Sequence, residues 1–130
     1  MNEIDKQWIC EVRECLDGFG TGGEDLYHVL STILFENKMN YLQFLASASE
    51  GHGCYAHEGL GYSLDQDWDF PEDFDEVAFF VGDFESSTLK VSEFLMAMSC
   101  ISKAYVERHV EDKQAVERYM EKISARYSSL

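Results

Sequence analysis

The sequence predicts an α+β fold, in which N-terminal and C-terminal helices pack with a small antiparallel β-sheet in a single domain. Apolar residues recur at helical spacing over residues 3–49 and 92–128, whereas residues 51–91 are interrupted by glycine and contain short runs of β-forming side chains. A chain of 130 residues fits one domain and can bury a core without a disulfide or a metal. We therefore expect one domain over residues 1–130, made of a helical part, a middle part with an acidic loop and the sheet, and a C-terminal helical hairpin.

Three helices are expected in the first part. The first covers residues 3–17, and the glycine cluster at residues 18–23 should end it. This cluster follows a helix and contains no Lys or Arg, so we interpret it as a flexible connector and not as a phosphate-binding loop. The second helix covers residues 24–37, and a shorter third helix covers residues 38–50.

The middle part begins with residues 51–64, which look irregular. Two later runs, EVAFFVG at residues 76–82 and TLKV at residues 88–91, are rich in β-formers and are predicted to be strands, joined by a turn in the sequence GDFESS. Helical spacing returns at Ser92, the expected N-cap. The pattern breaks around His109, and a last helix is predicted to follow.

The charge of the chain indicates the kind of partner. The formal net charge is −15, from 25 acidic and 10 basic residues. Phosphate backbones require a basic face and anionic membranes repel an acidic one, so binding to nucleic acid or membranes is not expected. Between Lys38 and Lys90 there is no Lys or Arg, while the same interval holds eleven acidic residues. A field of one sign steers a partner of opposite charge, so a basic protein is expected, with simple solubility as the alternative.

Two further features indicate the compartment. The N-terminus lacks the basic start and apolar run of a signal peptide, and no apolar run approaches the roughly 20 residues of a membrane span. We therefore expect a cytoplasmic protein. The four cysteines form no CxxC pair and are expected to be reduced, buried thiols: Cys10, Cys15, Cys54 and Cys100.

Two stretches have parts of a metal-binding pattern. DQDWDFPEDFDE, residues 65–76, has Asp at its first, third and fifth positions and Glu at its twelfth, as in an EF-hand loop. Its sixth position is Phe70 in place of the required Gly, and its flanks look extended, so no calcium site is expected. HGCYAHE, residues 52–58, holds three zinc-ligand side chains without a fourth and is better interpreted as a structured loop. No cofactor is expected.

No catalytic constellation stands out. There is no GxSxG nucleophile elbow, and sequence alone pairs none of the cysteines with a histidine. Paired carboxylates occur by chance in a stretch this acidic, so they do not indicate acid–base chemistry. The chain is therefore not expected to be an enzyme.

Aromatic residues stand among the acids of residues 65–76, which is the composition of a protein-binding hot spot. Trp68 has Asp on both sides and is expected to face a partner, whereas Phe70 and Phe74 face either the core or the partner. The candidate binding residues are Glu58, Asp65, Asp67, Trp68, Asp69, Glu72, Asp73, Asp75 and Glu76.

A resemblance to a known family is carried by three segments: DWDFPEDFDEVAFF, the hairpin after it, and VSEFLMAMSCISKAYVERHVEDKQAVERYMEKI. These segments, in roughly residues 51–124, resemble the immunity proteins of bacterial contact-dependent growth-inhibition (CDI) systems whose toxins are ribonucleases. The resemblance implies a cytosolic immunity protein that binds and blocks the basic C-terminal ribonuclease domain of its toxin, as a monomer or in a one-to-one complex. An acidic adaptor or regulatory module for another basic protein is the alternative.

Overall fold

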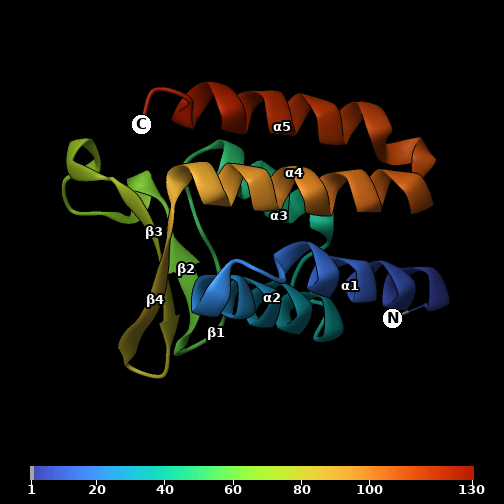
Figure 1. The fold of residues 1–130 in the computed structure, drawn as a ribbon, viewed down its shortest axis with the longest axis horizontal. Coiled ribbons are helices and arrows are strands. Elements are labelled where there is room, and N and C mark those ends of the chain that lie inside the picture. Colours follow the sequence, from blue (N-terminus) through green and yellow to red (C-terminus); the bar gives the residue numbers. More distant parts are fainter. Residues whose placement is uncertain (1) are drawn as a thin grey trace.

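The helices of the protein all lie on one side of a four-stranded antiparallel sheet (Figure 1). The structure is a computed structural model that describes residues 2–130. It confirms the α+β fold predicted from the sequence, in one compact domain. The helices are α1 (Glu3–Leu16), α2 (Gly20–Phe35), α3 (Tyr41–Ser49), α4 (Val91–Arg108) and α5 (Lys113–Tyr127). The strands, in the order β1-β2-β3-β4, are β1 (Tyr55–His57), β2 (Leu60–Ser63), β3 (Glu76–Val81) and β4 (Phe84–Lys90).

The glycine cluster is partly helical, which corrects the expectation of a flexible connector. Helix α2 begins at Gly20, and Gly22 and Gly23 are buried in its first turns. A Cβ atom on Gly23 would come within 2.6 Å of the Leu16 carbonyl oxygen, and one on Gly22 within 2.8 Å of the Thr88 carbonyl oxygen. The glycines therefore let α2 pack closely against the end of α1 and against β4.

The sheet is larger than the sequence predicts. The segment expected to be irregular contains β1 and β2, and β4 begins at Phe84, so that only Gly82 and Asp83 make the turn after β3. Gly82 has a φ of +73°, which suits glycine in a hairpin turn. These strands lack a clear apolar alternation. Pairing with β3 fixes β2 and β4, as in the Tyr62–Phe79 and Phe79–Ser87 pairs, and β1 pairs in turn with β2.

Helix α4 starts one residue before the expected N-cap. Its N-cap is Lys90, and the prediction of Ser92 in that role is wrong. The Glu93 side chain accepts a hydrogen bond of 3.0 Å from the Lys90 backbone N–H, so a carboxylate three residues into the helix satisfies a donor at its start. The helix ends at Arg108, at the break in spacing seen around His109.

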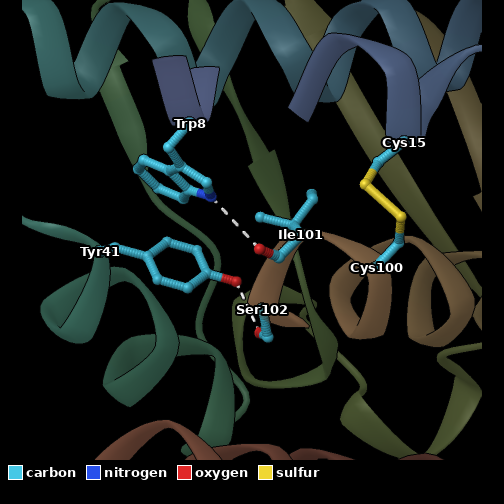
Figure 2. Close-up of a disulfide and its surroundings, with 6 residues drawn as sticks. All are labelled: Trp8, Cys15, Tyr41, Cys100, Ile101 and Ser102. Atoms are coloured by element: carbon cyan, nitrogen blue, oxygen red, sulfur yellow. Dashed lines mark hydrogen bonds between the residues drawn. A yellow bond between two sulfur atoms is a disulfide. The ribbon is translucent and has the colours of Figure 1, made fainter. Parts of the chain in front are cut away.

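The helical core is organised around Trp8, whose side chain is 1% exposed. Its Nε1–H donates to the Ile101 carbonyl oxygen over 3.3 Å (Figure 2). Its ring lies edge-on to the rings of Tyr41 and Tyr105, with 4.9 Å between centroids in each pair. The Tyr41 and Ser102 hydroxyls lie 2.8 Å apart, so this part of the core is aromatic but has its polar atoms paired.

The prediction of four reduced, buried thiols is wrong. Cys15 and Cys100 form a disulfide between α1 and α4, with 5.8 Å between their Cα atoms (Figure 2). Cys10 is a free thiol and is exposed, and Cys54 is free and partly buried. The two bonded residues are 85 positions apart, and they meet only because α1 and α4 pack side by side.

The length and polarity of the helices show whether any of them could span a membrane. Within residues 2–130, no helix is both long enough and apolar enough to cross a lipid bilayer.

Candidate protein-binding surface

Residues 65–76, the acidic segment, connect β2 to the start of β3 and protrude beyond the sheet (Figure 1). It folds into two short 3₁₀ turns, Asp65–Asp67 and Pro71–Asp73. Asp65 and Trp68 are partly buried. The other candidate binding residues are exposed, as the sequence predicts for a charged surface: Glu58, Asp67, Asp69, Glu72, Asp73, Asp75 and Glu76.

Asp65 attaches this segment to α5. Its carboxylate accepts hydrogen bonds from Arg126 Nε (3.0 Å) and Nη2 (2.9 Å) and from the Tyr127 hydroxyl (2.6 Å). Burial alone would raise the pKa of Asp65, but the bonds from Arg126, Tyr127 and Gln66 outweigh it and lower the pKa from 3.8 to about 2. The structure therefore gives Asp65 a fold-supporting contact within the chain, in addition to its place in the acidic segment.

The lowered pKa of Asp65 predicts a pH dependence of stability. A carboxyl whose pKa falls on folding stabilises the folded state above its unfolded pKa of 3.8, and this stabilisation is lost as the pH falls towards about 2. We expect Asp65 to account for about 2 kcal/mol of the free energy of unfolding lost between about pH 5 and pH 2. Urea denaturation across this range should show that loss in the native chain and a clearly smaller loss in Asp65→Asn; equal pH profiles would contradict it.

Asp67 attaches the segment to the loop before β1. Its carboxylate accepts from the backbone N–H groups of Gly53 (2.7 Å) and Leu64 (2.9 Å), and its second oxygen lies 3.1 Å from His52 Nδ1. The first and third positions of the EF-hand-like pattern, Asp65 and Asp67, thus bind different parts of the chain. Among the side chains that the structure describes, no three of His, Cys, Asp or Glu are grouped to hold a metal ion.

The three side chains of HGCYAHE that could bind zinc, His52, Cys54 and His57, also have different neighbours. His52 contacts Asp67, while His57 Nδ1 lies 3.0 Å from the Glu58 carbonyl oxygen. Burial, with a smaller contribution from the charge of Asp67, raises the pKa of the Cys54 thiol to about 12. A thiol with so high a pKa is a poor nucleophile at neutral pH.

A hollow of about 380 Å³ lies in the acidic segment, lined by Asp67, Trp68, Asp69, Phe70 and Asp73. Phe70 is 63% exposed, so this ring faces outward. Carboxylates beside exposed aromatic rings can bind an Arg or Lys side chain by charge-assisted hydrogen bonds and by cation–π contact.

The other two aromatic rings of the segment face inward to different extents. Phe74 is buried and lies 5.6 Å from the ring of Tyr127, which settles the alternative left open by the sequence. Trp68 is partly buried, and its ring meets Phe74 edge-on at 5.3 Å. Trp68 therefore both lines the hollow and packs against the fold.

A second set of exposed aromatic residues was missed by sequence reasoning. Tyr55 is 55% exposed and stacks on Phe80 at 6.4 Å across Gly61, and Phe84 is 77% exposed at the turn after β3. Phe80 pairs with Glu85 on β4, so an acid lies next to these rings on the sheet. Asp83 and Glu85 flank Phe84 in sequence, as Asp67 and Asp69 flank Trp68, and this repeated pattern was the available signal.

Comparison with known proteins adds no relative: no protein-family model, no curated protein and no solved structure matches the chain. The function is therefore argued from the surface itself.

Proposed function

We propose that this chain is a CDI immunity protein, which binds and neutralises the basic C-terminal ribonuclease domain of its cognate toxin. The observation that carries the proposal is the acidic surface: eleven acids and no Lys or Arg lie between Lys38 and Lys90. Exposed aromatic residues, Phe70, Tyr55 and Phe84, lie within the same stretch of chain. Acids with exposed aromatic anchors fit a basic protein surface.

Inhibition in this proposal is by binding alone. A ribonuclease needs a basic surface to hold RNA, and an acidic protein seated on that surface competes with the phosphates of the substrate. The chain needs no catalytic residue and no cofactor for this, and it occupies one toxin domain per chain. The hollow beside Phe70 would receive an Arg or Lys side chain of the toxin, since its lining supplies three carboxylates.

The test uses the neighbouring reading frame. We expect the neighbouring gene to encode a large secreted protein whose basic C-terminal domain stops growth when it is produced in cells. Co-expression of the native chain should restore growth and leave cellular RNA intact, and the two proteins should purify together. If the domain cleaves RNA at an unchanged rate with excess chain present, the proposal is wrong, and capture of a different basic protein would support the adaptor alternative.

Two aromatic residues of the acidic segment are expected to have different roles: Phe70 in binding the partner, and Trp68 in stabilising the fold. Phe70→Ala should shorten the lifetime of the complex by about tenfold or more, because an exposed ring in a charged surround acts only on contact. It should leave the melting temperature of the free chain unchanged, whereas Trp68→Ala should lower that temperature, since Trp68 packs against Phe74.

Surface plasmon resonance of each variant against the toxin domain, with a thermal melt of each free chain, checks both statements. Phe35→Ala is the matched comparison, because Phe35 is 56% exposed too but lies at the end of α2, outside the stretch between Lys38 and Lys90. Equal dissociation rates for native and Phe70→Ala complexes would remove Phe70 from the contact.

A further inference from the structure

The disulfide between α1 and α4 is more exposed to solvent on its Cys100 side than on its Cys15 side. Cys100 on α4 is exposed, whereas Cys15 on α1 is partly buried and packs against the core. A hollow of about 460 Å³ lies beside Cys100, lined by Leu95, Met96, Ser99, Cys100 and Lys103. Cys100 is therefore the half of the disulfide on whose side an external thiol approaches.

The disulfide is also the covalent tie at one end of the α1–α4 contact. The polar contacts between these helices involve the part of α1 up to Glu11 and the C-terminal half of α4. They are the hydrogen bonds Trp8 to Ile101 and Arg108 to Gln7, the ion pair Arg108–Glu11, and a contact of 2.9 Å between the Asp5 carboxylate and His109 Nε2, just after α4. Beyond Glu11, the disulfide is the covalent link between α1 and α4, and buried Val12 and Leu16 also hold this end of α1. Helix α2 packs against it as well, with Arg13 lying 5.5 Å over the Tyr27 ring.

We propose that the Cys15–Cys100 disulfide is a reversible redox switch, whose reduction loosens the C-terminal end of α1 from α4 and lowers the stability of the domain. The acidic segment has its own ties, from Asp65 to α5 and from Asp67 to Gly53, which reduction leaves in place. Reduction thus lowers the stability of the folded protein and leaves the acidic segment able to bind a partner. The redox switch goes beyond the proposed function and does not depend on it.

The reductant is a dithiol, and the reaction is a two-electron exchange. One thiolate of the dithiol attacks Cys100 Sγ, forming a mixed disulfide, while Cys15 leaves as a thiolate and takes up a proton. The second thiolate of the reductant then attacks the reductant sulfur that is bonded to Cys100. This closes a disulfide within the reductant, and Cys100 leaves as a thiolate and is protonated. The protein gains two electrons and two protons, and the dithiol becomes a disulfide.

Lys103 is placed to assist an anionic reductant. It lines the same hollow as Cys100, in a protein whose net charge of −15 otherwise repels anions. The anionic monothiol glutathione makes the same first attack on Cys100, and a second glutathione then resolves the mixed disulfide and leaves as glutathione disulfide. Lys103→Glu should slow this reduction by about threefold, with little effect on reduction by neutral dithiothreitol. Lys122→Glu makes the same charge change on α5 outside the hollow, so equal slowing by both variants would overturn the role of Lys103.

Stability is the first readout. A disulfide that closes a loop of 85 positions removes much of the freedom of the unfolded chain, so reduction should lower the melting temperature by about 10 °C or more. Cys10→Ser/Cys54→Ser keeps the disulfide and should show this drop when dithiothreitol is added. Cys15→Ser/Cys100→Ser should melt at the lower temperature with or without dithiothreitol.

Hydrogen exchange locates the effect. Amide protection in the reduced protein should fall over residues 12–19, the end of α1 and its connection to α2, and stay unchanged in β3. Two results would each overturn the proposal: four titratable thiols in the air-oxidised, denatured protein, or identical melting temperatures for oxidised and reduced Cys10→Ser/Cys54→Ser.

Discussion

Changing Asp69, Glu72 and Asp73 together to lysine is expected to weaken binding of the proposed toxin domain by at least about 100-fold. The three side chains are exposed on the protruding acidic segment, and two of them line the hollow beside Phe70. None of the three side chains makes a hydrogen bond or ion pair with another side chain that the structure describes, so the substitutions remove no such contact. Like charges brought together at an interface cost several kcal/mol, and the loss of steering lowers the association rate as well.

A matched triple variant tests whether binding depends on where the acidic residues lie or only on the net charge of the chain. Glu14→Lys, Asp17→Lys and Glu36→Lys give the chain the same net charge from exposed positions on and beside α1 and α2. Surface plasmon resonance at two salt concentrations should show slow, weakly salt-dependent association for the first triple variant and near-native rates for the second. Equal losses in both variants would mean that net charge alone, and not the acidic segment, attracts the proposed toxin domain.

The second large effect is expected in the core, where Trp8→Ala should lower the free energy of unfolding by about 3–5 kcal/mol. The indole is 1% exposed and touches Tyr41 and Tyr105, so its loss leaves a cavity between α1, α3 and α4. Its hydrogen bond to the Ile101 carbonyl oxygen is lost too. Trp8→Phe should recover part of the loss, because a ring still fills most of the site.

Urea denaturation followed by circular dichroism measures this effect without relying on the fluorescence of the removed residue. Ile4→Ala is the control on the same helix, because Ile4 is 48% exposed and its truncation leaves no cavity. A cost of less than about 1 kcal/mol for Trp8→Ala would show that the helices do not close around this residue.

The helices were predictable because their signal is local. Apolar residues repeat at the helical period in α1 and α5, and Asn40 begins α3 with a capping box completed by Gln43, three residues on. Each such signal needs only neighbours in the sequence. The same holds for the acidic segment, whose charge and length are read directly from its composition.

The sheet was only half predictable because its strands depend on partners. β3 is rich in β-formers, but β4 reads FESSTLK and is a strand because it pairs with β3 along its length. The glycines before α2 likewise looked like a connector until the close approach of Leu16 and Thr88 gave them a packing role.

By itself, the sequence determined the α+β class, the helices at both ends, the excess of acid and its concentration between Lys38 and Lys90. Only the tertiary structure decided how the individual side chains are used. It paired Asp65 with Arg126, turned Phe74 inward and Phe70 outward, and joined Cys15 to Cys100. The reason is physical: composition and period are properties of neighbouring residues, whereas burial and pairing depend on residues up to 104 positions away, as in His109 and Asp5, that only the packing of helices and strands brings together.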